Sequence, residues 1–176
     1  MAVLSGLGFA RALQKLCLGA SLLAATVATA TESGYVTLTL GNEQFELPLN
    51  AAHSDWTGSP GFAKVSILSR PTEVATWERF QSLRLAFDLL RTGATTPELS
   101  LLRRRDDAGF ERWYGRSESG GLTVVITERS LNDTELTVSG SFTGTLGRSD
   151  NFGQTIDLSE PMPVSGRFEV TLLPIR

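Results

Sequence analysis

The chain has 176 residues, with 16 Lys and Arg against 19 Asp and Glu, and a formal net charge of −3. The only basic cluster, Arg103 to Arg105, runs directly into Asp106 and Asp107, so composition and charge argue against binding to the phosphate backbone of nucleic acid. One Cys and one His exclude an intramolecular disulfide and a zinc site built from Cys and His alone.

Residues 1–30 have the organisation of a secretory signal peptide. Arg11 and Lys15 form a positively charged start, residues 16–27 are uncharged and largely apolar, and Ala28-Thr29-Ala30 is a small-x-small cleavage signal. A membrane anchor is the alternative, but it requires about 20 apolar residues. We therefore expect cleavage near Ala30.

Export leaves a single domain of residues 31–176, located in the periplasm or outside the cell. Cys17 lies inside the removed segment, in a context that does not resemble a lipid-attachment site. Removal of Arg11 and Lys15 leaves 14 basic and 19 acidic residues, a net charge of −5. Because such a domain contains no cysteine, its stability must come from packing and backbone pairing.

The first half of the domain predicts strands joined by turns. Residues 35–49 alternate around Gly41-Asn42 as in a hairpin, residues 51–61 break the pattern, and residues 63–67 resume it. The spacing of apolar residues in 72–80 is compatible with one short helix or with an extended connection. Further strands are predicted at 83–89, 99–101, 110–114 and 122–126.

The strongest signal is the alternation of residues 136–146, which places Phe142 on an apolar face and Thr143 on a polar one. Residues 164–172 repeat the alternation, so we expect these two strands to pair. Residues 147–163 between them are rich in Gly, Pro, Asp and Asn, which favours a long loop.

These patterns predict an all-β fold, a single-domain antiparallel β-sandwich of about nine strands. The chain shows no repeated alternation of strands and helices, which argues against a parallel α/β sheet. A β-barrel is the alternative, since many short strands separated by turns are typical of both architectures.

The two final strands carry Gly140-x-Phe142-x-Gly144 and Gly166-x-Phe168-x-Val170. This pair of motifs resembles the terminal hairpin of uncharacterised exported bacterial β-sandwich proteins. The resemblance covers less than a third of the domain, implies a curved β-hairpin, and brings no functional residues with it.

Catalytic machinery is not evident in the sequence. His53 is the only histidine, and although Ser54 and Asp55 follow it, a Ser-His-Asp relay is assembled in space rather than by adjacency. No Gly-x-Ser-x-Gly motif is present. A pair of carboxylates for glycoside cleavage stays open, because the two acids meet only in the fold.

A calcium site is a weaker hypothesis for the loop after residue 146. Ser149, Asp150, Asn151 and Asp157 supply oxygen atoms, but they lack the spacing of an EF-hand loop. The alternative is that Asp150 and Asn151 favour a turn through local hydrogen bonds. We therefore expect no bound metal and no cofactor.

Two features are candidates for binding. Trp56 lies in a polar segment where a large apolar side chain has little core to join, whereas Trp77 and Trp113 are expected to pack on the sheet. The other candidate is a row of hydroxyl side chains on the polar face of one strand, formed by Thr137, Ser139, Ser141, Thr143 and Thr145.

The hypothesis that follows is a non-catalytic exported domain that binds an envelope protein or a glycan through its loops or its hydroxyl row. A small-molecule or lipid carrier with a barrel interior is the alternative. A hydrolase that uses a carboxylate pair or His53 is a third possibility.

Overall fold

The computed structural model describes residues 32–59, 61–107 and 109–175. The predicted signal peptide of residues 1–30 and its cleavage near Ala30 lie outside the described residues. No helix in the described ranges has the length and apolar character needed to cross a membrane.

Within these ranges the chain forms ten strands, one short α-helix and one 3-10 turn. In chain order these are β1 (Ser33–Leu40), β2 (Glu43–Pro48), η1 (Ala51–His53), β3 (Asp55–Ser59), β4 (Phe62–Ser69), α1 (Val74–Trp77), β5 (Phe80–Leu90), β6 (Gly93–Arg104), β7 (Phe110–Arg116), β8 (Thr123–Leu131), β9 (Leu136–Arg148) and β10 (Asp157–Leu172).

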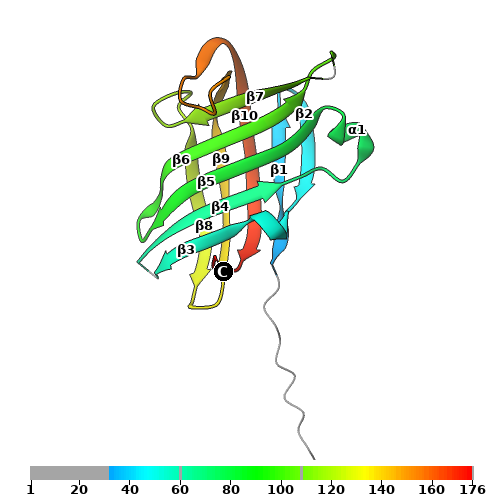
Figure 1. Cartoon of the computed structure of the whole chain (residues 1–176). Coiled ribbons are helices and arrows are strands. Elements are labelled where there is room, and N and C mark those ends of the chain that lie inside the picture. Colours follow the sequence, from blue (N-terminus) through cyan, green and yellow to red (C-terminus); the bar gives the residue numbers. More distant parts are fainter. Residues whose placement is uncertain (1–31, 60, 108, 176) are drawn as a thin grey trace, which may run out of the picture.

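All ten strands belong to one open antiparallel sheet with the order β2-β1-β10-β9-β7-β6-β5-β4-β3, and β8 pairs with β9 beside this path. The sheet bends into two layers. Figure 1 shows β3 to β7 running diagonally across β1, β2, β8, β9 and β10. The sandwich is therefore formed by one folded sheet.

Strand β9 joins the two layers. Its residues 136–143 pair with β8, and it also pairs with β10, but near its end Gly147 and Arg148 pair with Tyr114 and Trp113 of β7. A single strand thus contributes hydrogen bonds to both layers. This shared strand keeps the two layers in one continuous sheet.

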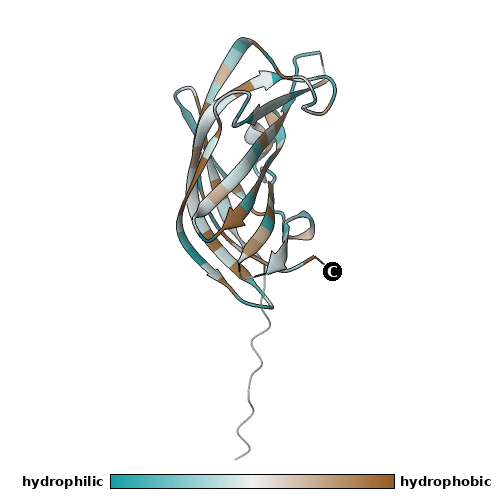
Figure 2. Cartoon of the chain, turned by 90° about the vertical axis from the view of Figure 1, so that its left-hand side faces the viewer, coloured by the Kyte–Doolittle hydropathy of each residue, from teal (hydrophilic) through white to brown (hydrophobic). Residues whose placement is uncertain are grey.

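The hydrophobic core lies between the layers. The rings of Phe87 on β5 and Phe168 on β10 have centroids 5.7 Å apart, and Phe45 on β2 meets Phe80 on β5 edge to face at 5.0 Å. Figure 2 shows hydrophobic and hydrophilic residues alternating along the strands. One face of each layer is buried, as a period of two requires.

Several expectations from the sequence are confirmed. The fold is all-β and antiparallel, and β9 pairs with β10 in a register that places Phe142 opposite Gly166. Phe142 is buried and Thr143 is exposed, as the alternation predicted. The predicted hairpin around Gly41-Asn42 is formed by β1 and β2.

Other expectations need correction. The strand missed by the sequence is β3, an edge strand whose residues mostly face solvent and which is held by backbone pairing with β4. The helical segment is a single turn, α1, and β10 starts at Asp157, so the loop before it is shorter than expected. The alternative β-barrel is not formed, because the sheet does not close.

Candidate functional site

The only histidine lies at the end of the 3-10 turn η1, where its side chain is exposed. The adjacent Ser54 hydroxyl is buried and fully used, because its Oγ lies 2.9 Å from Asn50 O and 3.1 Å from Leu68 O and accepts a hydrogen bond from Leu68 N. This hydroxyl ties η1 to β4. Its bonding gives it a structural role rather than that of a nucleophile activated by His53.

Trp56 does not lie in an exposed loop, so that part of the sequence interpretation is wrong. The residue belongs to β3, its side chain is 3% exposed, and it packs in the core. Its backbone also bonds to the segment that follows β10, with Trp56 N donating to Leu173 O and Ile175 N donating to Trp56 O. A buried indole presents no face on which a glycan can stack.

Trp77 shows the opposite error. Its side chain is 43% exposed at the end of α1, and Arg104 lies over its ring with the guanidinium carbon 5.5 Å from the centroid. Trp113 packs in the core as expected. Sequence spacing alone did not separate a tryptophan on a protruding turn from one inside the sheet.

The hydroxyl row lies on the outer face of β9. Thr143 is exposed, and the other four side chains are half-buried because β8 and β10 flank the strand. Some of its hydrogen-bonding capacity is used within the sheet, since the hydroxyls of Thr137 and Thr171 lie 3.2 Å apart. Thr137, Ser139, Ser141, Thr143 and Thr145 therefore form a partly covered polar row, and none of them lines the loop cleft described below.

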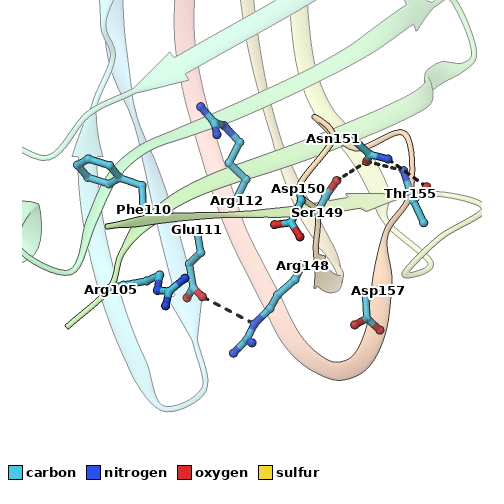
Figure 3. A pocket seen from close by; sticks show the side chains of 10 residues that line it. All are labelled: Arg105, Phe110, Glu111, Arg112, Arg148, Ser149, Asp150, Asn151, Thr155 and Asp157. Carbon is cyan, nitrogen blue, oxygen red and sulfur yellow. Dashed lines mark hydrogen bonds and ion pairs between the residues drawn. The ribbon is translucent and has the colours of Figure 1, made fainter. Parts of the chain in front are cut away.

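A large polar cleft lies beside the loop that joins β9 to β10. We call it the loop cleft. Its volume is about 860 Å³, within the range of small-molecule sites. Figure 3 shows its lining side chains, which come from β7, from the end of β9, from the joining loop, from the first residue of β10 and from the residue after β6: Arg105, Phe110, Glu111, Arg112, Arg148, Ser149, Asp150, Asn151, Thr155 and Asp157.

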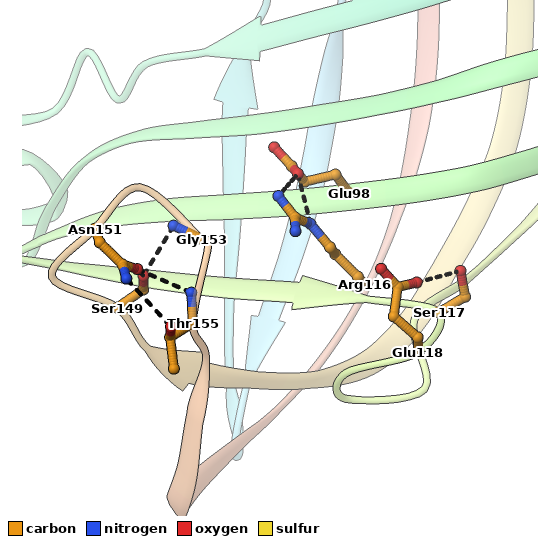
Figure 4. A network of polar contacts seen from close by, with 8 residues as sticks. All are labelled: Glu98, Arg116, Ser117, Glu118, Ser149, Asn151, Gly153 and Thr155. Atoms are coloured by element: carbon orange, nitrogen blue, oxygen red, sulfur yellow. Dashed lines mark hydrogen bonds and ion pairs between the residues drawn. The ribbon is translucent and has the colours of Figure 1, made fainter.

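The joining loop is ordered by its own side chains (Figure 4). The Ser149 hydroxyl donates to Asn151 Oδ1 at 3.0 Å and accepts from Gly153 N at 2.8 Å. Asn151 Oδ1 also accepts from Thr155 N at 2.9 Å, and Ser149 N donates to Arg112 O at 3.0 Å. These bonds hold the loop against β7 and give the cleft a defined wall.

The same hydrogen bonds argue against a calcium site in this loop, because they use the oxygens that would bind the ion. The side-chain oxygens of Ser149 and Asn151 accept hydrogen bonds from backbone amides, and Asp157 Oδ1 accepts one from Ser159 N at 2.9 Å. Across the described parts of the chain, no group of three or more His, Cys, Asp or Glu side chains is arranged to hold a metal. Local hydrogen bonds therefore account for the side-chain oxygens of Ser149, Asn151 and Asp157.

Charges in the loop cleft are balanced. Its lining holds Arg105, Arg112 and Arg148 against three acids, Glu111, Asp150 and Asp157. Hydrogen bonds from the Ser159 amide and hydroxyl hold the pKa of the Asp157 carboxyl below its ordinary value, so this group is ionised at neutral pH.

Glu111 is held by two arginines. Its carboxylate lies 3.8 Å from Arg103 Nε and 3.7 Å from Arg148 Nε, and Arg148 also contacts Glu160 at 3.0 Å. Another ion pair, between Arg116 Nη2 and Glu98 at 2.5 Å, joins β7 to β6 (Figure 4). The strand that forms one side of the cleft is thus fixed by charged contacts at both ends.

Two exposed phenylalanines were missed in the sequence as site residues, one that lines the cleft and one on the joining loop that packs against a lining arginine. Phe110 lines the cleft and is 51% exposed, while Phe152 on the joining loop is 67% exposed with Arg112 over its ring at 4.6 Å. Phe152 also has a φ of +56°, a conformation that is strained for a bulky residue. A large aromatic residue inside the turn-rich Asn-Phe-Gly segment was the available signal.

No family model, curated protein or solved structure showed a match to this chain. The geometry of the loop cleft is therefore the basis for the functional proposal.

Proposed function

We propose that this protein is a non-catalytic exported domain that binds a glycan in the loop cleft. The observation that carries the proposal is the exposed ring of Phe110 in a polar cleft of about 860 Å³, together with the exposed ring of Phe152 on the joining loop, which packs against the lining residue Arg112. Aromatic faces stack on the C–H face of a sugar ring, and the planar side chains of Asn, Asp and Arg bond to its hydroxyls.

The charge balance of the cleft favours a neutral ligand. Three arginines and three carboxylates line it, so its formal charge is zero. Glu111, Asp150 and Asp157 would repel a polyanion, and the three arginines would repel a polycation. A glycan satisfies both donors and acceptors without bringing a net charge.

The strained backbone of Phe152 also supports a binding role. Residues held in the left-handed region with a bulky side chain concentrate at ligand sites, where the surrounding structure maintains the strain. Here the Ser149 and Asn151 hydrogen bonds maintain it, and the result is an aromatic ring held on the surface. Pre-ordering of this kind lowers the entropy lost on binding.

Binding without catalysis fits the carboxylates of the cleft. Hydrolysis of a glycosidic bond requires a carboxylic acid that stays protonated, with a raised pKa. The pKa of Asp157 is lowered instead, and Glu111 is ion-paired with Arg103 and Arg148. His53 does not line the cleft.

The test is a glycan array followed by calorimetric titration of the best ligand. We expect Phe110→Ala and Phe152→Ala each to weaken binding about tenfold or more, the loss typical of an anchoring aromatic residue. The matched control is Val125→Ala, which removes an exposed apolar side chain on β8, outside the cleft, and should leave affinity unchanged.

Two outcomes contradict the proposal. One is a protein that binds no glycan, or one whose binding is unaffected by either phenylalanine variant. The other is capture of a stoichiometric protein partner whose binding Phe110→Ala and Phe152→Ala abolish. That result assigns the loop cleft to a protein interface.

A further inference from the structure

A second hollow opens at the edge of the core, between the two layers. We call it the end pocket. It has a volume of about 410 Å³ and lies among the β1–β2 turn, the first residues of β5, β6, β7 and residues 160–163 of β10. Its apolar lining consists mainly of Leu40, Phe45, Phe80, Leu101, Trp113 and Met162.

One residue that lines the end pocket, Trp113, has a buried hydrogen-bond donor without a partner among the described residues. Trp113 is 4% exposed, and its Nε1 has no acceptor within hydrogen-bond distance among the described residues. An indole N–H can only donate, and burying it unpaired costs free energy. A ligand acceptor that reaches this nitrogen from the pocket would satisfy the donor.

The charged side chains that line the pocket differ in how strongly ion pairs hold them. Arg79 forms an ion pair with Glu43, and its hydrogen bond holds the pKa of the Glu43 carboxyl below the ordinary value. Glu160 contacts Arg148 at 3.0 Å. Within the described parts of the chain, the one ion pair of Arg103 is its 3.8 Å contact with Glu111, so its guanidinium keeps donors available.

Two prolines reduce the number of backbone hydrogen-bond donors at the rim of the pocket. Pro161 and Pro163 line the pocket on β10 and have no backbone N–H. The lining thus combines an apolar floor with donors at two places, the indole of Trp113 and the guanidinium of Arg103. This combination matches a molecule with an apolar tail and an anionic head.

We propose that the end pocket binds a small amphipathic monocarboxylate, with its alkyl chain on the apolar floor and its carboxylate accepting hydrogen bonds from Trp113 Nε1 and Arg103. The proposal is independent of glycan binding in the loop cleft. It also differs from the carrier with a closed barrel, because the ligand lies at the open edge of a filled core.

The probe is decanoate, titrated below its micelle concentration while the three tryptophan indole N–H resonances are followed by ¹H–¹⁵N NMR. Trp113→Phe identifies the Trp113 resonance by its loss. We expect this resonance to shift saturably. Trp56 is an internal control, because its Nε1 is also buried without a partner in the described structure but it does not line the pocket.

Variants distinguish the contribution of the ligand's carboxylate head from that of its alkyl tail. We expect Arg103→Gln and Trp113→Phe each to weaken decanoate binding at least about tenfold, the loss of one charge-assisted or buried hydrogen bond. Arg103→Gln should leave the weaker binding of 1-decanol unchanged. The matched control Arg167→Gln, an exposed arginine on β10 outside the pocket, should leave decanoate binding unchanged.

The proposal is overturned if no saturable shift of the Trp113 resonance occurs. It is also overturned if the Trp56 resonance shifts equally, or if Arg103→Gln binds decanoate as the unaltered protein does. Phe110→Ala and Phe152→Ala serve to separate the two sites. They should weaken glycan binding without affecting the binding of decanoate.

Discussion

The ring of Phe142 on β9 lies directly over Gly166, its cross-strand partner on β10. A Cβ atom at Gly166 would collide with the Phe142 ring, and two residue pairs along, a Cβ at Gly140 would lie 2.7 Å from Phe168 Cζ. Each phenylalanine thus fills the space that the opposite glycine leaves open. This reciprocal arrangement explains why both strands carry a Gly-x-Phe pattern.

The first prediction concerns the face assignment of β9. Phe142→Ala removes a buried ring and should lower the free energy of unfolding by about 3–5 kcal/mol. Thr143→Ala, on the exposed face, should change it by less than about 0.5 kcal/mol. Urea unfolding followed by circular dichroism measures both, and equal effects would show that the faces are wrongly assigned.

The second prediction tests the close approach at Gly140. Gly140→Ala places a methyl group 2.5 Å from Val125 O and against the Phe168 ring, so we expect a loss of about 1–3 kcal/mol from overpacking. The control is Gly61→Ala, where nothing lies within 4 Å of the added atom. A stabilised Gly140→Ala protein is incompatible with the described packing.

The third prediction concerns the wall of the loop cleft. Ser149→Ala leaves the buried Gly153 amide without its acceptor, which should cost about 1–3 kcal/mol. Ser130→Ala, at an exposed position on β8, is the control and should be neutral. Hydrogen exchange should also accelerate at the Gly153 and Thr155 amides, and unchanged protection there would contradict the assigned network.

The fourth prediction separates stability from binding at Phe152. Asparagine tolerates the left-handed conformation better than phenylalanine does, and that conformation costs most residues about 1–2 kcal/mol. Phe152→Asn should therefore keep the stability of the unaltered protein while losing affinity for the glycan. Thermal unfolding measures the stability of the variant, and calorimetric titration measures its affinity for the glycan. A destabilised variant with full affinity would contradict the binding role of Phe152.

The fifth prediction is a pH dependence at the rim of the end pocket. The side-chain hydrogen bond from Arg79 lowers the pKa of Glu43 from its ordinary 4.5, so the pair stabilises the folded state above that pH. The contribution disappears as pH falls through the lowered pKa. The difference in unfolding free energy between the unaltered protein and Glu43→Gln should shrink on acidification, and a difference that grows there would contradict the sign.

Side-chain alternation was readable wherever one face of a strand is buried. It predicted β9, β10 and their pairing, because the direction of successive side chains depends only on local backbone geometry. It failed for β3, whose Asp-Trp-Thr-Gly-Ser sequence lacks alternation and whose strand is defined by its partner β4.

The candidate sites could be predicted only in fragments. The turn chemistry of Ser149, Asp150 and Asn151 was visible in the sequence, but Phe110 and Arg112 come from a strand about forty residues earlier and meet this loop only because β7 pairs with the end of β9. The unpartnered Trp113 Nε1 was invisible, because hydrogen-bond satisfaction depends on all neighbours of an atom.

By itself the sequence determined the all-β class, the buried and exposed faces of the long strands and the polar character of the joining loop, since these follow from the short-range rules of backbone geometry. Only the tertiary structure decided that one open sheet bends into two layers, that Trp56 is buried and that the loop cleft and the end pocket exist. These features depend on which distant strands pair and where the sheet bends, and contacts of that kind are set by the packing of the whole core.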